Sequence, residues 1–218
     1  MLTFLDSELY PDDCEVVELP VHKQYVYLIH KNGSSSLRKD ICSFNYKVYK
    51  NKDLCQLSLI DVYIRSPLER YISGVNTYLQ HLQRDNSNLD YDTCLWFATR
   101  YSFLNRHYLP QFLWLVNLSR FISPDCKICL RKFSDFSKIT KRNSRAGIDA
   151  PTTEFEKQCT QKMNNDLELW LYIDQLLEEM CGSSYTFKNI QKKLQQSSNG
   201  SYDILLKKFI EVSTSVLS

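Results

Sequence analysis

The residues best suited to chemistry follow an apolar run near the start of the chain. Residues 25–29 have the aromatic and branched content of a buried strand, and Lys31, Gly33 and three serines come directly after it. Apolar residues recur at helical spacing from Leu37, so the glycine and serines fall at a strand-to-helix turn. Such a turn presents free backbone N–H groups and the positive end of a helix dipole. The segment suits a phosphate, although an ordinary turn with an N-cap serine fits the same residues.

A second strand-to-helix boundary lies within residues 61–74. Ser66 is a candidate N-cap, Pro67 suits the first helical position, and Glu69 completes a capping box. Apolar side chains then recur at intervals of three and four, which predicts an amphipathic helix with one buried stripe made of Leu68, Ile72, Val75, Leu79 and Leu82.

Two polar side chains flank this boundary. Residues 62–64 predict a short buried strand, so Arg65 lies at its carboxyl end, and Ser73 lies in the second turn of the following helix. Both can reach a common point above the edge of the sheet. Arginine suits a phosphate there, because its planar guanidinium makes two parallel hydrogen bonds and keeps its charge.

The order strand, KxGxxS, helix, strand, RxPxxRxxS, helix resembles the sulfotransferases that use 3′-phosphoadenosine 5′-phosphosulfate (PAPS). The first motif departs from many members in having His30 in place of proline. The resemblance implies that Arg65 and Ser73 hold the 3′-phosphate. It also implies a 5′-phosphosulfate loop made of Lys31, Asn32, Gly33, Ser34, Ser35 and Ser36.

Sulfuryl transfer builds negative charge on the leaving 5′-phosphate. By analogy with phosphoryl transfer, the protein contributes mainly positioning and electrostatic stabilisation. Lys31 would stabilise the leaving phosphate, whereas Arg65 would serve recognition. Arg70 could touch the cofactor or an anionic acceptor, but a structural role on the polar face of its helix is favoured.

The segment NRHYLPQFL at residues 105–113 resembles the HxxPQ segment of the carbohydrate-type and related bacterial branch of that family. His107 is therefore the first candidate for the general base, since an imidazole accepts a proton near neutral pH. A packed structural histidine fits the same position. His30 is the second candidate, and three carboxylates between the two motifs stay open: Asp40, Asp53 and Asp61. Gln111 could position the acceptor or cap a local turn.

Later segments add weaker candidates. Residues 127–136 predict another strand and a polar turn, where relatives often carry a glutamate and this chain has Lys132 to Asp135. Residues 141–160 have loop chemistry, and the family often covers its nucleotide with a basic, glycine-containing loop. Arg145 and Gly147 are the cofactor candidates there. The basic residues between 131 and 145 suit a solvated loop, which is favoured, or a rim that attracts an anionic cofactor or acceptor.

The composition favours a single α/β domain, because 218 residues of which 43% are hydrophobic can bury one sizeable core. The resemblance implies a P-loop-like three-layer fold with a central parallel β-sheet flanked by helices. We expect one sulfotransferase-like domain over residues 1–218, with a core at 22–140, a loop at 141–160 and a helical C-terminal part at 164–218. That helical part offers no chemistry.

Several classes are disfavoured. A net charge of +2 with dispersed basic residues argues against a nucleic-acid surface. No signal segment or apolar run of membrane-spanning length is visible, which favours a cytoplasmic protein. The eight scattered cysteines indicate reduced thiols, and the one CxxC, Cys126 to Cys129, lacks the second pair that a zinc site needs. No metal is expected, and the oligomeric state is open.

The predicted function is transfer of a sulfuryl group from PAPS to a hydroxyl acceptor, with a carbohydrate favoured and adenosine 3′,5′-bisphosphate as product. The alternative is a non-catalytic binding or scaffold protein with the same fold. A P-loop nucleotide kinase fits less well, because Lys31 precedes the only nearby glycine, whereas a Walker loop places its lysine after the glycines.

Overall fold

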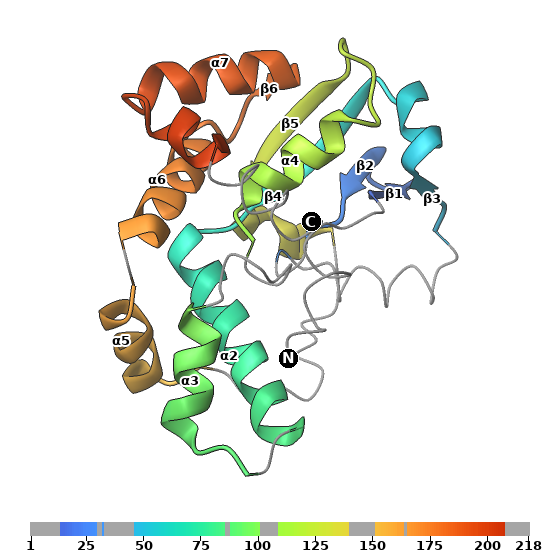
Figure 1. The fold of residues 1–218 in the computed structure, drawn as a ribbon. Coiled ribbons are helices and arrows are strands. Elements are labelled where there is room, and N and C mark those ends of the chain that lie inside the picture. Colours follow the sequence, from blue (N-terminus) through green and yellow to red (C-terminus); the bar gives the residue numbers. More distant parts are fainter. Residues whose placement is uncertain are drawn as a thin grey trace.

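The computed structural model describes residues 14–29, 32, 46–85, 88–100, 109–139, 151–163 and 165–207. In this part of the chain a six-stranded sheet has the order β3-β1-β2-β4-β5-β6 (Figure 1). The strands are β1 (Glu15–Leu19), β2 (Gln24–Tyr27), β3 (Val48–Lys50), β4 (Leu59–Ile64), β5 (Lys127–Lys132) and β6 (Ser184–Tyr185).

The sheet is mixed and only its centre is parallel. The strands predicted from the sequence, β2, β4 and β5, pair parallel to one another in that order. The outer pairs β1–β2, β1–β3 and β5–β6 are antiparallel. β1 and β2 form a hairpin, since only residues 20–23 join them and Lys23 adopts a positive φ of 51°. The expected central parallel sheet is thus a parallel core with antiparallel edges.

Successive side chains along a strand point to opposite faces of the sheet, and here both faces are buried. On one face Ile60, Val62 and Ile64 of β4 share a core with three helices, and Figure 1 shows one of these, α4, in front of the sheet. The three are α4 (Gln111–Ser119), α6 (Asn165–Glu179) and α7 (Phe187–Ser197). On the other face Val26 and Tyr63 pack with Phe136 of the short helix η3 (Phe133–Lys138). A further short helix, η1 (Asn51–Gln56), follows β3.

A second core joins the helices below the sheet in Figure 1. It is built from α2 (Pro67–Asp85), α3 (Tyr91–Arg100) and α5 (Thr153–Gln161), with contacts from α6. The predicted helix α2 is confirmed, but Leu68, which the pattern placed on its buried stripe, is 39% exposed. Because α2 packs against three helices, its buried side is wider than a single stripe.

The loop expected over residues 141–160 ends earlier than predicted, since α5 occupies its last part. The hydroxyl of Thr152 accepts a hydrogen bond from the backbone N–H of Phe155 at 3.1 Å, which caps the helix. Phe155 and Cys159, one turn apart, are both buried. Residues 141–150 lie outside the described part of the chain.

The helical character of the C-terminal part is confirmed where the structure describes it. α6 and α7 both lie within it, and residues 201–207 are helical after a turn at Asn199 and Gly200. Throughout the described ranges, no helix has both the length and the apolar character needed to cross a membrane.

Candidate functional site

The carboxyl ends of β2 and β4 lie together at one edge of the sheet. The two strands are parallel neighbours, with Val26 opposite Asp61. Asn32 follows β2 and Arg65 follows β4, so one residue from each predicted phosphate motif lies at this edge. The side-chain Nδ2 of the buried Asn32 donates a hydrogen bond to the carbonyl of Tyr63 at 2.7 Å.

Gln111, the first residue of α4, joins the two motifs and is completely buried. Its Oε1 accepts hydrogen bonds from Nδ2 of Asn32 at 2.6 Å and from the backbone N–H of Arg65 at 2.9 Å. Its Nε2 donates to the carbonyl of Arg65 at 2.9 Å. The Gln of the HxxPQ segment therefore binds protein groups, holding the backbone of Arg65 from both sides.

Asn32 has a positioning role in this geometry. Its two side-chain N–H groups go to Tyr63 and Gln111, and its backbone N–H donates to the carbonyl of Ile29 at 3.2 Å. The predicted contact between Asn32 and the cofactor phosphate thus lacks a donor, because protein acceptors take all three. Asn32 instead links the chain after β2 to β4 and to the start of α4.

The guanidinium of Arg65 lies over the turn after β5. Its Nε is 3.7 Å from a carboxylate oxygen of Glu69, and its Cζ is 5.4 Å from the centre of the Phe133 ring. The side chain keeps 20% of its surface exposed. The carboxylate expected to complete a capping box therefore approaches Arg65, and the turn that departs from the family pattern supplies a ring beneath the arginine.

Ser73 lies in the second turn of α2, as predicted, and is half-buried. Its carbonyl accepts a hydrogen bond from the hydroxyl of Thr77 at 2.9 Å. The remaining cofactor and base candidates lie outside the described residues: His30, Lys31, Gly33, Ser34, Ser35, Ser36, Asp40, His107, Arg145 and Gly147.

Two of the carboxylates left open as bases lie away from this edge. Asp53 is exposed in η1, beyond the outer strand β3. Asp61 is in the middle of β4, buried and paired with Arg131 of β5. The charge of Asp61 is therefore balanced within the sheet by Arg131. Neither Asp53 nor Asp61 lies where it could take a proton from an acceptor bound at the carboxyl ends of β2 and β4.

Two buried charges hold the chain at the start of α4: Arg70, for which the sequence favours a structural role, and Asp174, which sequence reasoning missed. Arg70 is only 2% exposed, in contrast to its predicted place on a polar helix face, and its Nη1 donates to the carbonyl of Leu109 at 2.5 Å. Asp174 of α6 accepts the backbone N–H groups of Gln111 at 2.7 Å and Phe112 at 3.0 Å. The signal for Asp174 was a carboxylate within an apolar helical stripe.

Burial dominates the electrostatics of both groups. It raises the pKa of Asp174 to about 6, although the charge of Arg70 and the hydrogen bonds from α4 act in the opposite direction. Burial also lowers the pKa of Arg70 to about 10. The opposite charges of Asp174 and Arg70 favour the ionised form of each, whereas burial opposes it.

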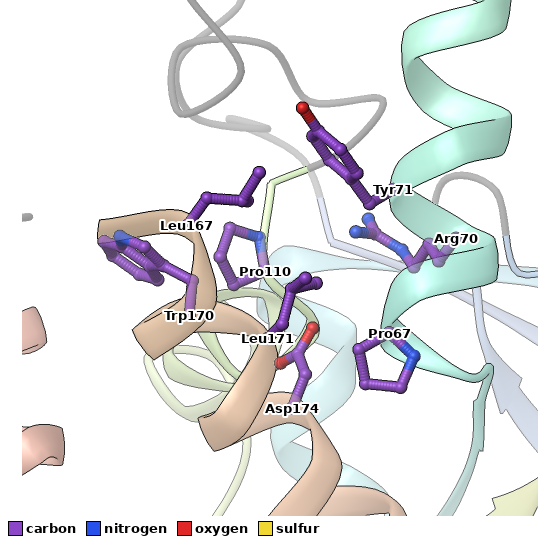
Figure 2. Close-up of a pocket in the computed structure, with 8 residues that line it drawn as sticks. All are labelled: Pro67, Arg70, Tyr71, Pro110, Leu167, Trp170, Leu171 and Asp174. Atoms are coloured by element: carbon purple, nitrogen blue, oxygen red, sulfur yellow. The ribbon is translucent and has the colours of Figure 1, made fainter. Parts of the chain in front are cut away.

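Arg70 and Asp174 face a small pocket between α2 and α6 (Figure 2). Its volume is about 10 Å³, roughly the room that one water needs. The other lining residues are Pro67, Tyr71, Pro110, Leu167, Trp170 and Leu171. This pocket is too small for a nucleotide. Arg70 and Asp174, which line it, hold the start of α4 beside the carboxyl ends of β2 and β4.

Among the residues that the structure describes, no group of three histidine, cysteine, aspartate or glutamate side chains could hold a metal ion. Comparisons of the chain with models of protein families, with curated proteins and with solved structures give no match.

Proposed function

We propose that this chain is a PAPS-dependent sulfotransferase that transfers a sulfuryl group to a hydroxyl acceptor. The observation that carries the proposal is the bonding of Gln111 to Asn32 and Arg65. It joins one residue from each of the three segments that resemble the family, although these segments are far apart in the sequence. They meet at the carboxyl ends of parallel strands, where ligands bind in open α/β sheets.

The geometry of Arg65 fits a phosphate ligand. Its backbone is held on both sides by Gln111, while its guanidinium stays partly exposed. A fixed backbone with an accessible planar cation favours bidentate phosphate binding, because less motion is lost on binding. We assign the 3′-phosphate to Arg65 and Ser73, and the 5′-phosphosulfate to Lys31 with the glycine and serines that follow it.

The proposed reaction breaks the bond between sulfur and the 5′-phosphate oxygen and forms a bond between sulfur and the acceptor oxygen. The acceptor proton passes to a base, for which His107 is our first choice and His30 our second. The other product is adenosine 3′,5′-bisphosphate. Lys31 would stabilise the charge on the leaving phosphate. Arg145 and Gly147 would belong to a loop over the nucleotide, within a three-layer, P-loop-like fold.

Nucleotide binding is the first test. Adenosine 3′,5′-bisphosphate at about 100 times its Kd should stabilise the protein by about 2.7 kcal/mol and raise its Tm by several degrees. Arg65→Ala should weaken binding by about 10- to 100-fold, since it removes charge-assisted hydrogen bonds. Arg84→Ala is the control, because Arg84 is an exposed arginine near the far end of α2, the helix that follows Arg65.

Transfer of radiolabelled sulfate from PAPS separates the enzyme from a non-catalytic binding protein. The acceptors are a polysaccharide, a phenol and a steroid alcohol, and Lys31→Ala should lose transfer. Binding without transfer to any acceptor would favour the scaffold alternative. If the nucleotide neither binds nor raises the Tm, and Arg65→Ala changes nothing, the proposal is wrong.

A further inference from the structure

We infer that Asp174 is a positioning residue of the proposed nucleotide site, acting on Arg65 through Gln111. This inference rests on the proposed function and extends it to the C-terminal helices, in which the sequence shows no chemistry. Asp174 lies 3% exposed in α6, remote in sequence from both phosphate motifs. Three steps connect its carboxylate to the arginine.

The first step is the start of α4. The N-cap residue is Pro110, whose side chain has no acceptor for the free N–H groups of the first turn. Asp174 supplies both oxygens from another helix, with Oδ2 accepting from Gln111 and Oδ1 from Phe112. A negative charge is also favourable at this end of the helix dipole. The carboxylate therefore fixes where Gln111 begins the helix.

The second step is the orientation of the Gln111 amide. Its Nε2 faces two acceptors, the carbonyl of Arg65 at 2.9 Å and Oδ2 of Asp174 at 3.4 Å. Its Oε1 faces two donors, the N–H of Arg65 and Nδ2 of Asn32. A flipped amide would set oxygen against oxygen and N–H against N–H. Oδ2 of Asp174 thus adds to the contacts that select the one orientation that binds both motifs.

The third step is charge balance around the aspartate. Arg70 of α2 lies across the small pocket from Asp174, as Figure 2 shows, and is the charged group that lowers the pKa of Asp174. Arg70 also holds the carbonyl of Leu109, two residues before Gln111. Arg65 is a second cation near this pair, and its positive charge lowers the pKa of Arg70. The segment that begins α4 is therefore held from α2 and from α6.

A double-mutant cycle tests the coupling between the two residues. We expect Asp174→Asn to weaken adenosine 3′,5′-bisphosphate binding by about tenfold in the otherwise unchanged chain. In the Arg65→Ala background the same change should weaken binding by less than about twofold, because the group being positioned is gone. Glu179→Gln, an exposed carboxylate of the same helix, is the control and should leave binding unchanged.

A general loss of structure gives a different result, since it would lower affinity equally in both backgrounds. Equal losses would overturn the inference, as would an Asp174→Asn variant that binds normally while Arg65→Ala does not. If Asp174→Asn fails to fold, Gln111→Met decides, because it keeps the volume and removes the amide. Normal nucleotide affinity in Gln111→Met would also overturn the inference. Failure of the unchanged chain to bind would instead refute the proposed function.

Discussion

Asp174 and Arg70 are ionisable side chains whose burial carries a desolvation penalty. Each is almost completely buried, and burial disfavours the charged form of both, as their shifted pKa values show. Apolar residues of similar size would avoid this penalty. A carboxylate that accepts two N–H groups at the start of α4 gives something that apolar side chains cannot, namely a fixed position for Gln111.

Stability should depend on pH through Asp174. Its folded pKa of about 6 exceeds the ordinary value of 3.8, so the folded state binds the proton more tightly. Its contribution to the free energy of unfolding is therefore greatest below about pH 4 and falls as the pH rises to about 6. The measurement is the difference in unfolding free energy between the unchanged chain and Asp174→Asn in urea, at several pH values.

That difference should decrease between about pH 4 and pH 6 and level off above about pH 7. Glu178, whose pKa is also raised by burial, is present in both proteins and cancels in the comparison. If the unfolding free energies of the two proteins instead change with pH in parallel, Asp174 has an ordinary pKa in the folded protein.

Glu69 should compete with the nucleotide for Arg65. Its carboxylate lies 3.7 Å from Nε of Arg65 and is largely exposed. Because an exposed pair of this kind contributes up to about 1 kcal/mol, Glu69→Gln should raise affinity for adenosine 3′,5′-bisphosphate by up to about fivefold. Titration calorimetry at low salt measures the change, with Glu179→Gln as the control. Weaker binding in Glu69→Gln would mean that the carboxylate orients the arginine.

At the scale of elements, sequence patterns predicted those with strong periodicity or clear ends. β4 and α2 were found because a branched apolar run meets a serine, a proline and a glutamate at the right spacing. The antiparallel strands β1 and β3 were missed, since β1 carries glutamates at both of its partly exposed positions and β3 has only three residues. α5 was missed because only Phe155 and Cys159 mark its buried side.

The cap of α5 gives a prediction at this scale. Thr152→Ala removes the acceptor for the N–H of Phe155 and should lower the free energy of unfolding by about 1 kcal/mol. Thr160→Ala is the matched control, since its hydroxyl bonds within the same helix and alanine is a better helix former. Urea unfolding of the three proteins gives the comparison. Equal losses in both variants would argue against a capping role for Thr152.

At the scale of the whole molecule, local pattern could not show which residues meet. Asn32 and Gln111 are 79 positions apart, and Gln111 and Asp174 are 63 apart. Parallel strands bring the first two motifs to one edge, which sequence order alone suggested. The contact of α6 with the start of α4 depends on how helices pack on the sheet, and no spacing in the sequence encodes it.

The central claim is a site for two phosphates, one of them bound by Arg65. The most direct measurement compares the affinities of adenosine 3′,5′-bisphosphate and adenosine 5′-phosphate, for the unchanged chain and for Arg65→Ala. Loss of the 3′-phosphate should weaken binding to the unchanged chain by about 10- to 100-fold, and to Arg65→Ala by much less. Equal affinities of the unchanged chain for the two nucleotides would contradict the account.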